Sequence, residues 1–175
     1  MNDTATQESL FDFEIAPASH GKHRLALIQA IQDEADWSIG ERGGKNYLNR
    51  KGVGDRLSFR RETNPSSSRL NVLSRCWVIR DAAEATGAVV ANFEWKPWKG
   101  GSIVCRSGNE TSISPKRTKM GLVSSPWFSL SRKTIKAPVI DVPPKYSRLS
   151  IPAEYSEKTE VILIAAYLII RSWGE

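Results

Sequence analysis

VILIAAYLII, residues 161–170, is the segment of this 175-residue chain that says most about its fold. Ten apolar residues follow one another between Glu160 and Arg171. The run is too short to cross a bilayer as a helix, which requires roughly 20 residues. Because no face of it is polar at a period of 3.6 or of 2, it must be enclosed on all sides. We predict that it runs, as a helix or as a strand, through the middle of a sheet or barrel.

The body of the chain carries short strand-like segments separated by turns. They are rich in β-branched and aromatic residues and lie at 57–61, 69–81, 86–95, 102–106, 110–114 and 126–136. The pair 69–81 and 86–95 is predicted to form a hairpin, and the proline-rich stretch 137–152 is predicted to be extended or looped. Strands at about ten-residue spacing favour an antiparallel sheet curled toward a barrel. The predicted fold class is therefore mainly β with a few helices, enclosing the C-terminal hydrophobic segment.

The N-terminal part of the chain differs from this body in its residue pattern and its charge. Residues 22–38 place Leu25, Ile28 and Ile31 three residues apart, which predicts an amphipathic helix that ends before Gly40. Residues 1–20 are acidic and are predicted to be a mobile lead-in, with a short strand as an option. The domain organisation is then one β-rich domain over 21–175, with the helix at 22–38 and a barrel-like body over 47–175.

Charge is distributed unevenly along the chain, whose net charge is +6. Residues 1–41 hold two basic and eight acidic side chains, whereas residues 42–150 hold twenty-one basic and seven acidic ones. A basic body favours polyanionic partners, which include anionic phospholipid surfaces and nucleic acid. A solvated basic surface with no partner is the alternative. The acidic head is predicted either to dock on the basic body and screen it or to be an ordinary covering helix.

The sequence carries no catalytic motif. A glycine-rich phosphate loop, zinc-ligand spacing and a Gly-x-Ser-x-Gly elbow are all absent from it. His20 and His23 lie together near the N-terminus, far in sequence from Cys76 and Cys105, which are predicted to be buried thiols in a reducing compartment. The N-terminus does not resemble a secretory signal. We predict a non-enzymatic protein without cofactor or metal, cytoplasmic or peripherally attached to a membrane, with no transmembrane span.

Basic clusters with neighbouring tryptophans are the best functional lead. The anion-binding candidates are Lys96, Lys99, Lys116, Arg117, Lys119, Arg132 and Lys133, and the interfacial aromatic candidates are Trp95, Trp98 and Trp127. A cation beside an exposed indole suits a membrane interface, where the ammonium group meets phosphate. The same pair suits a stacked single-stranded base, so nucleic-acid binding is the second hypothesis. A self-assembling or protein-interaction module is the third, and in the plainer alternative the tryptophans belong to the core.

Two patterns resemble the tubby C-terminal-like superfamily, which includes phospholipid scramblases and LURP-one proteins. The stretch 77–81 reads W-x-I-x-D, and 87–95 reads G-x-x-V-A-x-x-E-W, an element similar to that of small fungal domains of uncharacterised function. The closing apolar segment is similar to the helix at the centre of the family's barrel. The resemblance, over roughly 55–175, implies a barrel whose basic rim binds phosphoinositides, at Lys96, Lys99, Lys116, Arg117 and Lys119. Because the acidic calcium-binding pattern of scramblases is absent, it does not imply lipid transport.

Overall fold

The structure, a computed structural model, describes residues 10–17, 24–32, 34–62, 75–83, 87–96, 100–116, 139–141 and 147–174. These residues form eleven strands, one 3-10 helix and one α-helix. The strands are β1 (Leu10–Pro17), β2 (Arg24–Ala30), β3 (Asp36–Arg42), β4 (Lys45–Arg50), β5 (Gly54–Glu62), β6 (Arg75–Asp81), β7 (Val89–Lys96), β8 (Gly100–Cys105), β9 (Glu110–Lys116), β10 (Val139–Asp141) and β11 (Ser147–Pro152). The helices are η3 (Ala153–Lys158) and α1 (Thr159–Gly174).

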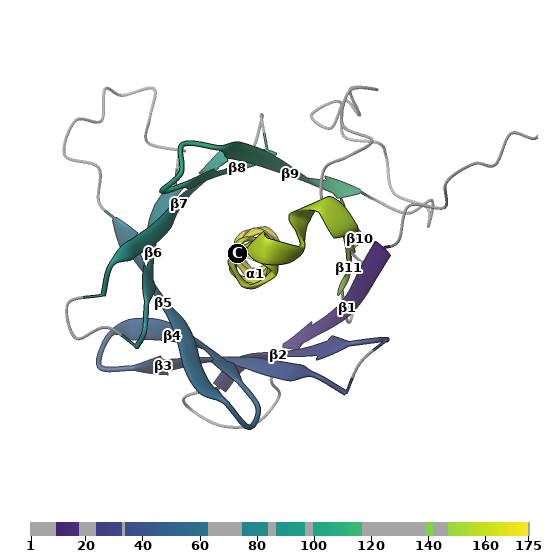
Figure 1. Cartoon of the computed structure of the whole chain (residues 1–175), viewed down its shortest axis with the longest axis horizontal. Helices are drawn as coiled ribbons and strands as arrows, with labels where there is room; N and C mark the ends of the chain where they lie inside the picture. The colour runs from purple at the N-terminus through teal and green to yellow at the C-terminus, as the bar shows by residue number, and fades with distance from the viewer. Residues whose placement is uncertain are drawn as a thin grey trace, which may run out of the picture.

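The strands form a closed barrel in the order β1-β11-β10-β9-β8-β7-β6-β5-β4-β3-β2 (Figure 1). Neighbouring strands pair antiparallel, except that β10 runs parallel to β9. The ring closes at β1, which pairs with β2 on one side and with β11 on the other. Closure gives every strand of the ring a neighbour on each side, which protects its backbone hydrogen-bonding groups. The predicted fold class, a β-rich curled sheet or barrel around the C-terminal segment, is confirmed.

The apolar segment forms α1, which runs through the centre of the barrel (Figure 1). Residues 161–169 are each at most 7% exposed, because the inner faces of the strands surround the helix on every side. The structure thus confirms the enclosure and decides that the segment is a helix. Over the residues that the structure describes, no helix combines the length and the hydrophobicity that a membrane crossing requires.

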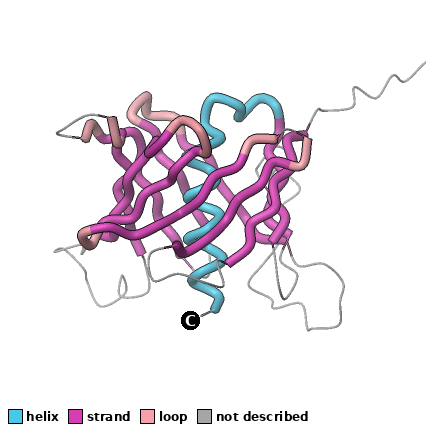
Figure 2. Tube along the Cα trace, turned by 90° about the horizontal axis from the view of Figure 1, so that it is seen from below, coloured by secondary structure: helices cyan, strands magenta, loops and turns pink. Residues whose placement is uncertain are grey.

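The two ends of the barrel differ in what they carry. We call the end where η3 leads into α1 the entrance end, and the end where α1 finishes the exit end (Figure 2). The antiparallel pairings place the turns at 51–53 and 106–109 at the entrance end. They place the turn at 43–44, between β3 and β4, at the exit end. Gly43 and Gly44 have φ values of 58° and 76°, the left-handed conformation that a two-residue hairpin turn requires.

The helix predicted over 22–38 is wrong, because β2 and β3 pair as antiparallel strands. The buried residues of β2 are Ala26, Ile28 and Ala30, which alternate at the period of a strand. Ile31, which the helical pattern placed on the apolar face, is 47% exposed. A stretch of seven residues is too short to separate the helical period of 3.6 residues from the strand period of 2. Hydrogen-bonded pairing with β1 and β3 makes this stretch a strand.

The described part of the acidic head belongs to the barrel wall. Residues 10–17 form β1, the strand that closes the barrel, so a short strand is confirmed where a mobile lead-in was the main expectation. Since β1, β2 and β3 are integral strands of the ring, removing residues 1–42 would open the barrel. The prediction that a helix over 22–38 covers the barrel and screens its basic surface is therefore wrong, because β2 and β3 are strands of the barrel wall.

Most strands predicted in the body are confirmed. The hairpin of β6 and β7 forms as expected, and β5, β8 and β9 lie at the predicted segments. The proline-rich stretch contributes β10 and β11, whereas the predicted strand at 126–136 lies outside the described residues. Cys76 and Cys105 are free thiols, as expected, but both are half-buried rather than fully buried.

Candidate anion-binding groove on the barrel wall

The sequence-predicted lipid-binding residues are only partly described. Lys96 ends β7 and Lys116 ends β9, so the topology brings both backbones to the exit end. The Lys96 ammonium lies 3.0 Å from a Glu94 carboxylate oxygen, so its charge is largely compensated. The other candidates lie outside the described residues: Lys99, Arg117, Lys119, Arg132, Lys133, Trp98 and Trp127.

Trp95, predicted as an interfacial aromatic, belongs to the core. It is 2% exposed and shares the inner face of β7 with Ala91 and Phe93. Strand alternation explains this placement, since every second residue of β7 points into the barrel. The sequence showed the same alternation, so the plainer alternative of a core tryptophan holds at this position. Trp95 is not available to a membrane surface in this fold.

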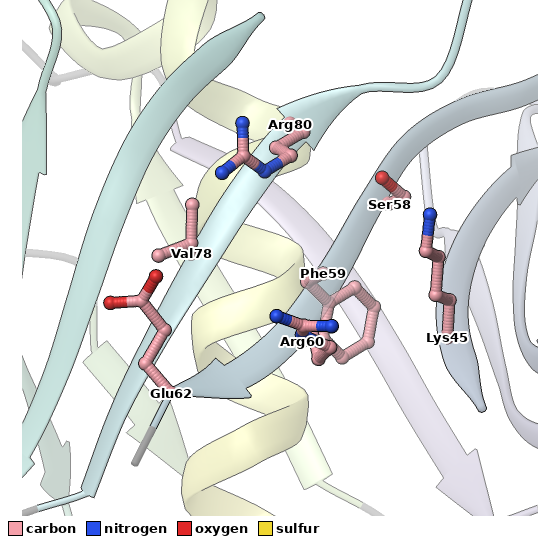
Figure 3. A pocket seen from close by; sticks show the side chains of 7 residues that line it. All are labelled: Lys45, Ser58, Phe59, Arg60, Glu62, Val78 and Arg80. Atoms are coloured by element: carbon pink, nitrogen blue, oxygen red, sulfur yellow. The ribbon is translucent and has the colours of Figure 1, made fainter. Parts of the chain in front are cut away.

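The described residues do form a basic groove elsewhere, on the outer wall over β4, β5 and β6 (Figure 3). It is a depression of about 250 Å³. We call its three cations, Lys45, Arg60 and Arg80, the groove cations. Ser58, Val78 and Glu62 complete the outward-facing lining.

Strand register explains why these side chains meet. On β5 the inward residues are Leu57 and Phe59, so Ser58, Arg60 and Glu62 point outward. In the pairing of β5 with β6, Ser58 lies opposite Arg80, and Arg60 lies opposite Val78. Lys45 reaches the same place from β4, because the next residue along that strand, Asn46, pairs with Phe59.

The lining of the groove carries more positive than negative charge. The guanidinium of Arg80 donates a hydrogen bond to the Gly87 carbonyl at 3.0 Å, which fixes its direction, and no described carboxylate forms an ion pair with it. Lys45 and Arg60 are exposed, and the structure gives neither of them an ion pair within the described residues. Glu62 is the single acidic residue of the lining. Three cations against one carboxylate make a site that an anion would stabilise.

Several other described cations are paired with carboxylates. Arg42 bonds Asp55, Lys51 lies 3.8 Å from Asp36, and Arg56 bonds Glu160 at 3.1 Å. Within the part of the chain that the structure describes, the groove cations differ from these three paired cations because none of them has a carboxylate partner. Among the described side chains, no three His, Cys, Asp or Glu residues gather as metal ligands. The arrangement of three cations around one depression can bind an anion.

Sequence reasoning missed the groove cations, although a signal was present. The stretch 57–61 was predicted as a strand that ends in two arginines. Each of three neighbouring strands carries a cation at an outward-facing position. Basic residues at alternate positions of the predicted strands are therefore the signal in the sequence that indicates this groove. The predicted anion-binding residues are basic residues close together in the sequence. The groove cations are far apart in the sequence and meet only through the register of three strands.

Comparison of the chain with protein-family models, with curated proteins and with solved structures gives no match in any of the three. The resemblance to the tubby-like superfamily therefore stays a prediction.

Proposed function

We propose that this protein is a non-enzymatic module that binds the phosphate head groups of an anionic phospholipid surface through the groove cations. The observation that carries the proposal is that Lys45, Arg60 and Arg80 line one depression together with a single acidic residue, Glu62 (Figure 3). Guanidinium groups match phosphate oxygens in paired hydrogen bonds, and an ammonium adds a point charge. Each cation close to an acidic leaflet contributes about 1 kcal/mol, so three of them support a measurable, salt-sensitive affinity.

Lipid is favoured over nucleic acid by the lining of the groove. Sequence-tolerant binding of single strands uses aromatic platforms on which bases stack. The one aromatic residue in the lining, Phe59, is 2% exposed and packs inward against Tyr167 with ring centroids 6.2 Å apart. A compact basic depression without an outward aromatic suits a single phosphorylated head group better than a polymer track.

Vesicle flotation tests the proposal directly. The full chain is expected to float with phosphatidylcholine vesicles that contain a phosphoinositide and not with phosphatidylcholine alone. Raising the salt from about 0.1 M to about 1 M shortens the Debye length from roughly 10 Å to roughly 3 Å, so binding should fall sharply. The double variant Lys45→Glu/Arg60→Glu should bind at least tenfold more weakly, as expected from about 1 kcal/mol for each lost cation.

A charge-matched variant provides the control. Lys51→Glu/Arg106→Glu makes the same change in net charge on exposed turns at the entrance end, away from the groove. It should keep most of the binding if the groove is the site. Equal losses in both double variants would indicate general electrostatic attraction and reject the groove. Absence of flotation at low salt would reject the proposal, and retardation of an oligonucleotide instead would favour the nucleic-acid hypothesis.

A further inference from the structure

A second cavity lies at the entrance end, where the first turn of α1 meets the rims of β3, β4 and β5. Its volume is about 370 Å³. Leu57, Val90 and Val161 form its apolar wall, and the indole of Trp37 lies beside them. Arg50, Arg56, Glu157 and Glu160 supply its charges. We call it the entrance cavity; it shares no lining residue with the groove.

Trp37 carries the first unusual feature of the entrance cavity. Its side chain is 7% exposed, and within the described residues its Nε1–H group has no hydrogen-bond acceptor. Buried donors are almost always paired, because leaving one unpaired costs the free energy of its lost hydration. An acceptor brought into this cavity by a ligand would satisfy the indole N–H and recover that cost.

Arg50 carries the second feature. It lies opposite Trp37 in the pairing of β3 with β4, and its guanidinium carbon is 5.4 Å from the centre of the indole ring. This cation–π contact orients the guanidinium while leaving its N–H donors available. Within the described residues the structure gives Arg50 no carboxylate partner. Among the described residues, the cavity is therefore lined by a charged donor group without a carboxylate partner, and the Trp37 residue beside it carries a buried N–H group without an acceptor.

The other charges of the cavity narrow the class of ligand. The Arg56 Nε–H group donates to both carboxylate oxygens of Glu160, at 3.1 Å and 3.3 Å, so this cation is already compensated. Glu157 also lines the cavity and would repel a second negative charge. A ligand with one negative charge is thus favoured over a dianionic phosphate. The apolar wall favours a ligand with a hydrocarbon part, since Leu57 and Val161 are buried there.

We propose that the entrance cavity binds a small organic carboxylate that carries an apolar group. Its two oxygens accept hydrogen bonds from the Arg50 guanidinium and from Trp37 Nε1. Its hydrocarbon part lies against the apolar wall, next to the first turn of α1. The charge-assisted hydrogen bond from the Arg50 guanidinium gives this site its preference for a carboxylate over an uncharged ligand.

Calorimetric titration of the full chain with octanoate tests this site. A ligand of this size in a preformed cavity should bind with a Kd of about 1 mM or tighter. Arg50→Gln removes the charge but keeps a polar side chain, and should weaken binding about tenfold or more. Trp37→Phe keeps an aromatic ring but removes the N–H donor, and should weaken binding severalfold. Inorganic phosphate should compete poorly with octanoate.

The control is Lys51→Gln, which removes an exposed cation adjacent to Arg50 that does not line the cavity. It should bind octanoate like the parent. The site is rejected if octanoate shows no saturable binding, or if folded Arg50→Gln binds as tightly as the parent. A loss in Lys51→Gln equal to that in Arg50→Gln would also reject it, because attraction to general positive charge would then explain the binding.

Discussion

Replacing Ala166 with Asp tests the enclosure of α1 most severely. Ala166 is 0% exposed, and its neighbours along the helix from residue 162 to residue 169 are also buried. A carboxyl group at this position meets only apolar side chains, so its charged form loses hydration without gaining a partner. Burial raises the pKa of such a carboxyl by up to 3–5 units in the fully buried case.

This difference in pKa between the folded and the unfolded chain lowers the free energy of unfolding. If the folded-state pKa lies at or above about 7, the folded chain stays protonated at pH 7 while the unfolded carboxyl, with a pKa of about 3.9, ionises. At 1.36 kcal/mol per unit, that difference destabilises the fold by about 4 kcal/mol at pH 7 and by about 1.5 kcal/mol at pH 5. Burying the neutral carboxyl adds roughly 1–3 kcal/mol at either pH. The total approaches the 5–15 kcal/mol by which domains are typically stable.

Urea unfolding at pH 5 and at pH 7 measures both contributions, the one from the shifted pKa and the one from burying the neutral carboxyl. Ala166→Asp should lose stability on going from pH 5 to pH 7, because protonation of the buried carboxyl relieves the penalty in acid. Ala166→Asn has a similar size and no charge, so it should be destabilised without this pH dependence. An Asp at the exposed turn residue Ala83 should change stability by less than about 0.5 kcal/mol. Parent-like unfolding of Ala166→Asp at pH 7 would refute the enclosure.

Two further predictions concern packing and pH. Gly101→Ala should destabilise the barrel by about 1–3 kcal/mol, because a Cβ there would lie 2.7 Å from both Ile113 Cγ2 and Phe93 Cε2; chemical denaturation measures the loss, and a stable variant would contradict this close packing. Burial, with a smaller effect of the Glu154 carboxylate, raises the pKa of Tyr155 above its usual 10.0. Stability should therefore fall as pH rises above 10, where the unfolded tyrosine ionises first, and Tyr155→Phe should reduce this fall in unfolding experiments between pH 9 and pH 11; equal slopes for parent and variant would exclude Tyr155 as a cause.

Several features of this protein could be predicted from the sequence because they depend on local pattern. The run 161–170 has no polar face, and no soluble structure can leave such a run uncovered, so its enclosure followed from composition alone. The hairpin of β6 and β7 was also predicted, because strand-forming residues flank a turn that contains Gly87. By contrast, the predicted helix over 22–38 failed because Leu25, Ile28 and Ile31 fit a helical period over a stretch too short to exclude a strand.

Local sequence pattern was thus enough to predict a β-rich chain with an enclosed C-terminal segment. That this segment is a helix depends on the three-dimensional packing, since a segment apolar on every side can be a helix or a strand once a barrel surrounds it. The groove cations and the pairing of Trp37 with Arg50 were likewise decided by the tertiary structure. Their side chains meet through the register between strands, and register is set by the packing of the whole ring around α1.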